Sequence, residues 1–483
     1  MKFGLYSIVC IMSALFSGSA CYDLRATKGK LTTAGLNYLK EFGLEEVRKH
    51  LRDISLPDES GSTSIKVGHV DYSLTGMKII GFNFGTTNIA TSPPNRLPLS
   101  LYGGFIDVVG NWATKLKVIF TIKDHGRFEA KANGINIDLT VMFNVDSQGK
   151  PQVSAGNCRV DIGGFSVKVH GGASWLYNLI LDLAKSSIKR SLQKQICPSV
   201  RKAIDIQAEK ALHDLQVTAN IFKNINVDYS LVGEPNMTSN SLSQGIKGIF
   251  YPKENPEIKF PFPPPVISSP FKANNKMAQV VVSTYSANTF MYSAWKSGLM
   301  DIWITKAILP EKFAKYNLTT DLIAPLVPGF KKFPGRPLKL RLTATNFPQV
   351  IIHPNVTIIK GEGDFLTYIV LKQNETRFEA MNLHITFSVS AAVMINDEKI
   401  VPKLADVSVH LTLKSSAVGK VPVNVVNLLL KGALKVSIMP SLNKYLSQGY
   451  LIPSFNGLST VNSSIMLEKD YVEICSNFKY NPN

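Results

Sequence analysis

The sequence predicts an α+β protein built from two similar, strand-rich halves. At 483 residues the chain is too long for one comfortable core and suits two domains. In both halves, long runs alternate strictly between apolar and polar residues, which is typical of strands with one buried face. A proline-rich run, Phe260 to Pro265, lies near the midpoint. Proline fixes φ and removes a backbone donor, so this run predicts an extended, semi-rigid spacer between the halves.

Residues 1–20 are expected to be a secretory signal peptide. Lys2 gives a positive start, Leu5 to Phe16 is mostly apolar, and Gly18-Ser19-Ala20 offers small residues for cleavage. The alternative, a buried first helix, does not account for the short apolar core followed by a cleavage-like site.

The rest of the chain is expected to be a secreted, extracellular glycoprotein. Its most apolar later stretch, Val421 to Met439, carries Lys431 and Lys435 and is therefore not expected to span a bilayer. Several N-x-Ser/Thr acceptor sequences support export. They lie at Asn236, Asn317, Asn355, Asn374 and Asn462.

The first half contains two clear alternating runs. Leu116 to Ile122 predicts one strand and Ile135 to Val145 another. Asp124-His125-Gly126 and Asp146-Ser147-Gln148-Gly149 supply turn chemistry beside them.

Two helices are expected in the first half. The early one could be capped by Thr32 or Thr33, and the late one starts near Ser174. The early apolar stripe is Leu36, Leu39, Gly43, Val47, Leu51 and Ile54. The late stripe is Trp175, Leu179, Leu183, Ile188, Leu192, Ile196, Val200 and Ile204.

The second half repeats this order of elements. Strands are expected at 338–344, 383–395 and 407–413, where apolar residues again alternate with polar ones. An early helix is expected from Ser283 to Trp295 and a late one from Val423 to Leu446, interrupted by Pro440. The two halves thus share the order of their elements, although they show no recognisable sequence similarity to each other.

Cysteine usage agrees with export. Cys10 leaves with the signal peptide and Cys21 lies at the expected cut. An oxidising compartment would preserve a Cys158–Cys197 bridge, and Cys475 then stays free unless Cys21 survives and pairs with it. A metal site is the alternative for these thiols, but no CxxC or nearby histidine supports one.

The chain is basic, with a net charge of +18. Residues 22–250 carry 27 basic and 20 acidic residues, and residues 251–483 carry 25 and 15, so the second half is the more basic. In an exported protein this charge favours anionic lipid, glycan or bacterial envelope over nucleic acid. The alternative is a solubility charge spread over a large surface.

Catalytic signatures are absent from the sequence. It contains no GxSxG, HExxH, Walker-type loop or dinucleotide fingerprint, and the eight histidines are scattered singly. A catalytic triad formed by residues far apart in the sequence remains an alternative, because such residues come together only in the folded protein. What the chain offers instead is apolar area, which could either form closed cores or enclose acyl chains.

Several segments, taken in order, resemble the bactericidal/permeability-increasing protein family, which also contains lipopolysaccharide-binding and lipid-transfer proteins. The resemblance covers essentially the whole mature chain and includes the Cys158–Cys197 interval and the central prolines. The segments are Leu31 to Tyr38, Gly68 to Leu74, Gly149 to Pro151, Trp175-Leu176, Val227 to Val232, Gly245 to Tyr251, Pro310 with Phe313, and Pro422 to Leu446.

The resemblance implies two pseudo-symmetric, strongly twisted antiparallel β-barrels with long helices, joined by a central sheet into an elongated, boomerang-like molecule. The domains would be 21–250 and 276–483, with the proline-rich linker at 251–275. It also implies a single structural bridge, Cys158–Cys197, and one apolar lipid pocket per barrel. Candidate lipid-contact residues are Leu36, Leu39, Val47, Leu51, Trp175, Leu179, Leu183, Phe290, Tyr292, Val425, Leu428, Leu429 and Leu434. Each of them could equally belong to a closed core.

Antibacterial members of this family bind lipopolysaccharide phosphates through basic loops at the tip of the first barrel. The corresponding candidates are Lys66, Lys115, Lys117, Lys123, Arg127 and Lys150. Asp58-Glu59-Ser60-Gly61-Ser62 departs from the pattern, being acidic and polar where a cationic loop is expected.

The sequence therefore predicts a secreted lipid-binding protein without catalytic activity, metal or cofactor, whose ligand is a bound phospholipid. Expected partners are phospholipid or lipopolysaccharide and an anionic membrane surface, with no nucleic acid and a monomeric state. Envelope recognition in innate defence is the leading role. A phospholipid or sterol carrier without antibacterial action, and an adhesive glycoprotein with sealed cores, are the alternatives.

Overall fold

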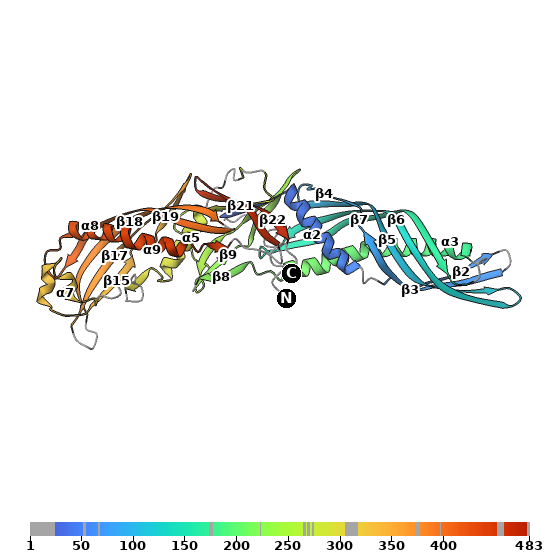
Figure 1. Ribbon diagram of the computed structural model, residues 1–483, viewed down its shortest axis with the longest axis horizontal. Helices are drawn as coiled ribbons and strands as arrows, with labels where there is room; N and C mark the ends of the chain where they lie inside the picture. Colours follow the sequence, from blue (N-terminus) through green and yellow to red (C-terminus); the bar gives the residue numbers. More distant parts are fainter. Residues whose placement is uncertain are drawn as a thin grey trace. The chain divides into compact units, whose positions relative to one another are not determined.

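The computed structural model describes residues 25–51, 55–65, 68–172, 177–222, 224–263, 267, 271–272, 275–304, 317–371, 377–396, 398–451 and 458–480. They form two compact units (Figure 1). The first comprises Leu31–Leu215 and Glu234–Gln244, and the second comprises 25–30, 216–233 and 245–480. Both consist mainly of antiparallel sheets with a few helices, which confirms the α+β class. The expected signal peptide lies outside the described residues, and the domain boundaries at 250 and 275 stay a prediction.

The first unit is built on a sheet of unusually long strands. Its order is β2-β3-β5-β6-β7, with β4 paired to β5. The bounds are β2 Glu59–Ile65, β3 Gly68–Asn83, β4 Thr86–Ile89, β5 Arg96–Lys117, β6 Thr121–Val145 and β7 Pro151–His170. The β5–β6 register shifts near Gly104, a bulge of the kind that lets long strands coil.

Two long helices pack on this unit, as predicted. They are α2 (Thr33–Leu51) and α3 (Tyr177–Lys202), and α3 is followed by a π-helix η2 (Ala203–Ala208) and α4 (Glu209–His213). Thr32 caps α2, because its Oγ1 accepts a hydrogen bond from the Gly35 N–H at 3.4 Å. Ala184, Ile188 and Leu192 of α3 are fully buried in the same core as the inward face of the sheet.

A disulfide fixes α3 to the edge of the sheet. Cys158 on β7 and Cys197 on α3 are bonded, with their Cα atoms 5.8 Å apart, which confirms the predicted pair. Cys475 is free and buried.

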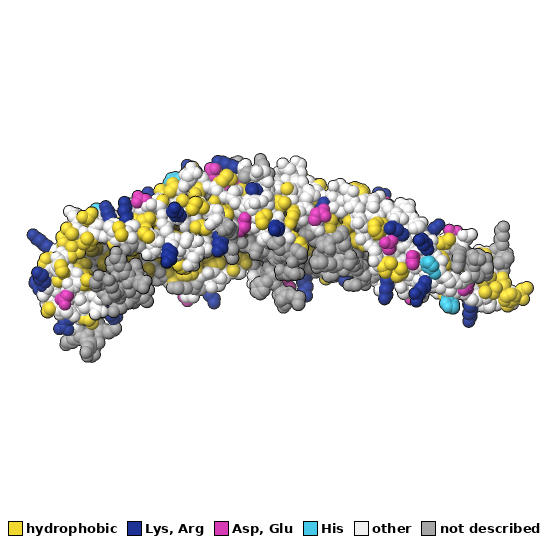
Figure 2. Space-filling model, in the orientation of Figure 1, with side chains coloured by type: hydrophobic (Ala, Val, Ile, Leu, Met, Phe, Trp, Pro, Cys, Tyr) yellow, Lys and Arg dark blue, Asp and Glu magenta, His cyan; other side chains and the backbone are white. Residues whose placement is uncertain are grey.

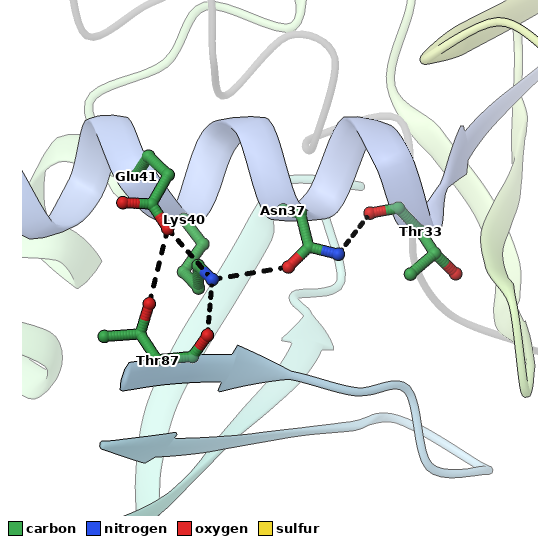
Figure 3. A network of polar contacts seen from close by, with 5 residues as sticks. All are labelled: Thr33, Asn37, Lys40, Glu41 and Thr87. Carbon is green, nitrogen blue, oxygen red and sulfur yellow. Dashed lines mark hydrogen bonds and ion pairs between the residues drawn. The ribbon is translucent and has the colours of Figure 1, made fainter. Parts of the chain in front are cut away.

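A buried lysine holds α2 against β4. The Lys40 side chain is only 6% exposed, and its ammonium donates to the Thr87 carbonyl at 2.8 Å (Figure 3). It also donates to Asn37 Oδ1 at 3.3 Å and pairs with Glu41 at 3.0 Å. Thr87 in turn donates its hydroxyl to Glu41, so the two elements are joined by a closed polar network.

The predicted strand Leu116 to Ile122 is wrong. β5 ends at Lys117, β6 begins at Thr121, and Val118 to Phe120 form the turn of a hairpin. Asp124-His125-Gly126, expected as a turn, lies inside β6, where Gly126 pairs with Trp112. The alternation of apolar and polar residues predicted a continuous strand here because the turn itself is made of apolar residues. The residues typical of turns, Asp124-His125-Gly126, lie further along, inside the strand.

The second unit contains a seven-stranded sheet. Its order is β14-β15-β17-β18-β19-β20, with β16 paired to β17. The bounds are β14 Asp301–Ile304, β15 Leu338–Ala344, β16 Gln349–His353, β17 Val356–Val370, β18 Arg377–Asn396, β19 Lys399–Ser416 and β20 Tyr450–Leu451. β15, β18 and β19 confirm the three strands predicted from alternation. Phe330, Ile369 and Ala380 lie fully buried at the centre of its core.

Two further sheets complete the described structure. A three-stranded sheet has the order β12-β9-β8, and a six-stranded sheet has the order β10-β11-β1-β13-β22-β21. Their bounds are β8 Thr218–Phe222, β9 Ile225–Asp228, β12 Ile249–Pro252, β1 Thr27–Thr32, β10 Leu231–Thr238, β11 Ser241–Ile246, β13 Ala278–Ser283, β21 Leu458–Glu468 and β22 Tyr471–Tyr480. The six-stranded sheet thus takes strands from the start, the middle and the end of the sequence.

The second unit also has its predicted early and late helices. α5 (Thr284–Lys296) begins after Ser283, whose hydroxyl accepts from the Ser286 N–H. The late helix is continuous through Pro440: α8 (Val423–Ala433) passes into a π-helix η4 (Leu434–Ile438) and then α9 (Met439–Leu446). Pro440 lies in the first turn of α9, where its missing N–H costs least. Shorter helices are α7 (Thr320–Ile323) and η3 (Pro328–Lys332).

The start of the proline-rich run is packed against the second unit. Phe260 and Phe262 lie on Tyr285, with ring centroids 6.0 and 5.2 Å away. Phe262 also stacks at 5.6 Å from Phe347. Aromatic contacts therefore fix this part of the run, and its role as a semi-rigid spacer between the halves stays a prediction. Pro264 and Pro265 lie outside the described residues.

Candidate functional site

The end of the β5–β6 hairpin brings together basic side chains from neighbouring strands. Lys115 on β5 and Lys123 on β6 are directly paired in register. Both are exposed, and neither makes a salt bridge within the described part of the chain. Like charges directly opposite one another destabilise a sheet. Asp71 on β3 lies opposite Lys115 on its other side and offsets part of this cost.

Lys117, one residue before the turn, is partly neutralised. Its ammonium pairs with Asp71 on β3 at 2.8 Å. The hydrogen bond from Lys117 is the largest cause that lowers the pKa of Asp71, so this carboxylate stays ionised. Lys117 is therefore a weaker candidate for binding an external phosphate than Lys115 or Lys123.

The two unpaired lysines share a shallow cavity of about 470 Å³. Asp71 and Asp124 also line it, as does His125, so its charge is mixed rather than uniformly positive. The remaining lining residues are Tyr72, Ser73, Ala113 and Thr114.

An apolar tip projects beyond these lysines. Ile119 is fully exposed, Phe120 is 67% exposed and Val118 is also open to solvent. Figure 2 shows hydrophobic side chains gathered at this end of the hairpin. Sequence reasoning missed the tip because it counted these residues as part of a strand. The sequence carried no signal for this turn, since Val118 to Phe120 contains none of the residues typical of turns.

The other predicted head-group residues do not join this cluster. Arg127 lies further along β6, opposite Asn111 and His170. Lys150 follows the opposite end of β6, where its ammonium donates to the His213 carbonyl at 2.8 Å. Lys66 lies outside the described residues. The acidic segment begins with Asp58, which accepts from the Gly76 N–H, and continues as β2.

Predicted lipid-contact residues of the first unit are divided between packed and undescribed positions. Leu36 and Leu39 of α2 are buried, and Leu183 of α3 is half-buried. Trp175 and the side chains of Val47, Leu51 and Leu179 lie outside the described structure. Contact of these residues with lipid stays a prediction.

In the second unit, the candidates fall into two groups. Phe290 packs on Phe250 at 5.5 Å, and Tyr292 lies in the aromatic cluster that holds Phe262 and Phe347. Val425, Leu428 and Leu429 of α8 instead lie at the surface, and Leu434 is half-buried. A lipid contact by the α8 residues would therefore be made at an open face.

The second unit has a shallow cavity of its own, of about 390 Å³. Its lining is largely polar and includes Asn346, Gln349, Lys360, Glu362 and His410. This lining differs from the apolar lipid pocket that was predicted, so the apolar pockets stay a prediction.

The predicted glycosylation sites are accessible where they are described. Asn236, Asn317, Asn355 and Asn462 are all exposed, and Asn374 lies outside the described residues. Their occupancy stays a prediction.

Long antiparallel sheets with a few helices packed on them define the class of protein by its fold, and this fold is shared with a known family. The chain belongs to the LBP / BPI / CETP family: the model of its N-terminal domain matches residues 35–215, and that of its C-terminal domain matches residues 180–480. This membership confirms the resemblance seen in the sequence.

Relatives match along almost the whole length. The chain is 30% identical to a bactericidal permeability-increasing protein of Sebastes schlegelii, covering 94% of this chain and 95% of the relative. It is 26% identical to a lipopolysaccharide-binding protein of Mus musculus, covering 93% of each. A crystal structure of lipopolysaccharide binding protein matches with a TM-score of 0.61 at 25% identity, covering 94% of this chain and 99% of that one. The fold is thus shared, and the chain is a lipid- or lipopolysaccharide-binding type of protein.

Proposed function

We propose that this chain is a secreted, non-enzymatic protein that binds the acyl chains of lipid and recognises anionic lipid of the bacterial envelope in innate defence. The observation that carries the proposal is the end of the β5–β6 hairpin, where an exposed apolar turn is flanked by lysines. Lipopolysaccharide and phospholipid present the same two features, phosphate above acyl chain. Two of the relatives bear names that refer to bacterial permeability and to lipopolysaccharide.

The proposed mechanism is sequestration in two steps. Val118 to Phe120 would enter the acyl layer while Lys115 and Lys123 remain at the level of the phosphates, because apolar burial and charge attraction act at different depths. Acyl chains would then be held in one apolar pocket per unit. No cofactor or metal is required, the lipid itself is the ligand, and we propose that the protein works as a monomer.

A phospholipid or sterol carrier without antibacterial action is the second candidate. The observation that favours it is the mixed charge of the cavity beside the lysines, where Asp71 and Asp124 weaken any attraction for phosphate. A carrier would use the same apolar tip and pockets but would not distinguish lipopolysaccharide from neutral phospholipid.

Vesicle binding across a salt series separates the two. We expect tighter binding to vesicles containing lipopolysaccharide than to phosphatidylcholine, and the difference should shrink as salt rises, because exposed charges are screened. Equal, salt-insensitive binding to both would support the carrier instead.

Matched variants assign the effect to residues. Lys115→Gln with Lys123→Gln should weaken lipopolysaccharide binding by about 1–2 kcal/mol and leave phosphatidylcholine binding unchanged. Lys150→Gln is the control, since its lysine lies at the opposite end of β6 and donates to a backbone carbonyl. Equal losses in the double variant and the control would contradict the assignment to the hairpin.

A further inference from the structure

The late helix of the second unit, which runs through α8, η4 and α9, has an apolar face that the protein does not cover. Leu428 is 70% exposed, Leu429 is 56% exposed and Val436 is 72% exposed. Val425, Leu442 and Tyr445 are exposed as well. Among the described side chains of this segment only Met439 is buried. Figure 2 shows hydrophobic side chains over the position that α8 has in Figure 1.

This helix is apolar on two opposite sides. Val423, Val426 and Leu430 pack against the core of the second unit. Val425, Leu428 and Leu429 lie on the other side, and Val436 follows about two turns after Leu429 on the same side. A helix that is apolar all round is normally enclosed by protein or lipid. By length and composition alone, Val423–Leu446 is apolar enough to cross a membrane.

The charges on this helix itself have a single sign. Lys420, Lys431, Lys435 and Lys444 are all exposed. The sequence has no Asp or Glu from residue 407 to residue 467. Asp406 lies just outside that stretch and approaches Lys435 at 4.0 Å, with both side chains largely in solvent.

From the open apolar face and the lysines along this helix, we infer that it docks on the surface of an anionic phospholipid membrane. It lies in the interface rather than crossing it. Two lysines near its middle would be costly in the hydrocarbon centre, and its other side is held by the core of the unit. The lysines contact lipid phosphates, while Leu428, Leu429 and Val436 enter the boundary of the acyl layer. This surface uses none of the residues of the Lys115–Lys123 cluster; because Leu428 and Leu429 are also candidate lipid-contact residues, the inference rests on the proposed function and adds a second docking surface to it.

Vesicle flotation of the full chain tests the inference, with phosphatidylcholine containing phosphatidylglycerol as the anionic membrane. Leu428→Ser with Leu429→Ser should reduce partitioning about tenfold or more, because two leucines lose their burial in lipid. Leu322→Ser is the matched control, an exposed leucine of α7 in the same unit, and should change little. Lys431→Gln with Lys435→Gln should reduce partitioning roughly 20-fold at low salt, and only on anionic vesicles. Lys331→Gln with Lys332→Gln, two exposed lysines of η3, is its control.

A fluorescent probe reports contact directly. An environment-sensitive dye on Val436→Cys should shift to the blue when anionic vesicles are added; the native Cys475 does not compete, because it is buried. Absence of a shift would overturn the inference. A second variant, Ile119→Ser with Phe120→Ser, removes the apolar tip of the hairpin. If this variant loses vesicle binding while the helix variants bind as the parent does, the inference is also overturned. Light scattering tests whether a second copy covers this face instead. In that case the measured mass would rise with protein concentration, and the Leu428→Ser/Leu429→Ser variant would return it to the mass of a monomer.

Discussion

At the scale of single residues, Lys40 and Cys475 show two opposite ways in which a titratable side chain can be buried. Lys40 keeps its charge because three oxygen acceptors surround its ammonium. For Cys475, burial and the nearby Glu473 raise the pKa of the thiol to about 11. The Lys40 ammonium is thus stabilised by hydrogen-bond acceptors, whereas the Cys475 thiol stays protonated and neutral.

Lys40→Ala should lower the free energy of unfolding by about 1–3 kcal/mol, because it removes the donor shared by α2 and β4 and the packing of a buried stem. Thermal unfolding measures the loss. Lys168→Ala, an exposed lysine on β7, is the control and should stay within about 0.5 kcal/mol of the parent. A Lys40 variant as stable as the control would show that the network in Figure 3 contributes nothing.

Cys475 should resist alkylation in the folded protein at pH 8 and react after denaturation. The raised pKa keeps the thiol protonated at that pH, and the side chain is buried as well. Peptide mapping by mass spectrometry measures the modified fraction in each state. Rapid labelling of the native protein, or a disulfide at Cys475, would contradict the buried free thiol.

At the scale of elements, the sequence predicted secondary structure well wherever one face of an element is buried. Alternation predicted β15, β18 and β19, and helical patterns predicted α2, α3, α5 and the helix of α8 to α9. It failed at Val118 to Phe120, because an exposed turn made of apolar residues continues the period of a strand. The sequence also predicted that Pro440 interrupts the late helix. The chain instead stays helical there, because a π-helix precedes the proline.

The missed turn at Val118 to Phe120 also hid the arrangement of the candidate site. The lysines could be named from the sequence, but which of them meet is set by strand register. Lys115 faces Lys123 only because the turn falls between them, whereas Lys150 lies beyond the far end of β6. Pairing across a hairpin cannot be read from residues whose turn has no sequence signature.

The disulfide is the element-scale feature with the clearest energetic consequence. Cys158→Ala should lower the stability of the first unit by about 2–5 kcal/mol, because it frees the link between β7 and α3. Calorimetry measures the change in melting temperature. The double variant Cys158→Ala/Cys197→Ala should behave like the single one, and an unchanged melting temperature in both would show that the bridge is not formed in the protein.

At the scale of the whole molecule, two features recur in both units and suit a lipid-binding protein. Each unit packs a late helix interrupted by a π-helix beside its large sheet, with Pro198 in the first and Pro440 in the second. Each also exposes apolar side chains next to lysines, at the hairpin end in one unit and along α8 in the other. The duplication first seen as an order of elements therefore extends to surface chemistry.

The central claim is that the folded protein holds lipid, and extraction of the native protein tests it most directly. The purified chain would be extracted with organic solvent and the extract analysed by mass spectrometry, with a mock purification as the control. We expect phospholipid at up to about two molecules per chain, since each apolar pocket would retain an acyl chain at about 0.8 kcal/mol per buried methylene. A native, correctly folded protein that yields no lipid above the mock control would contradict the claim.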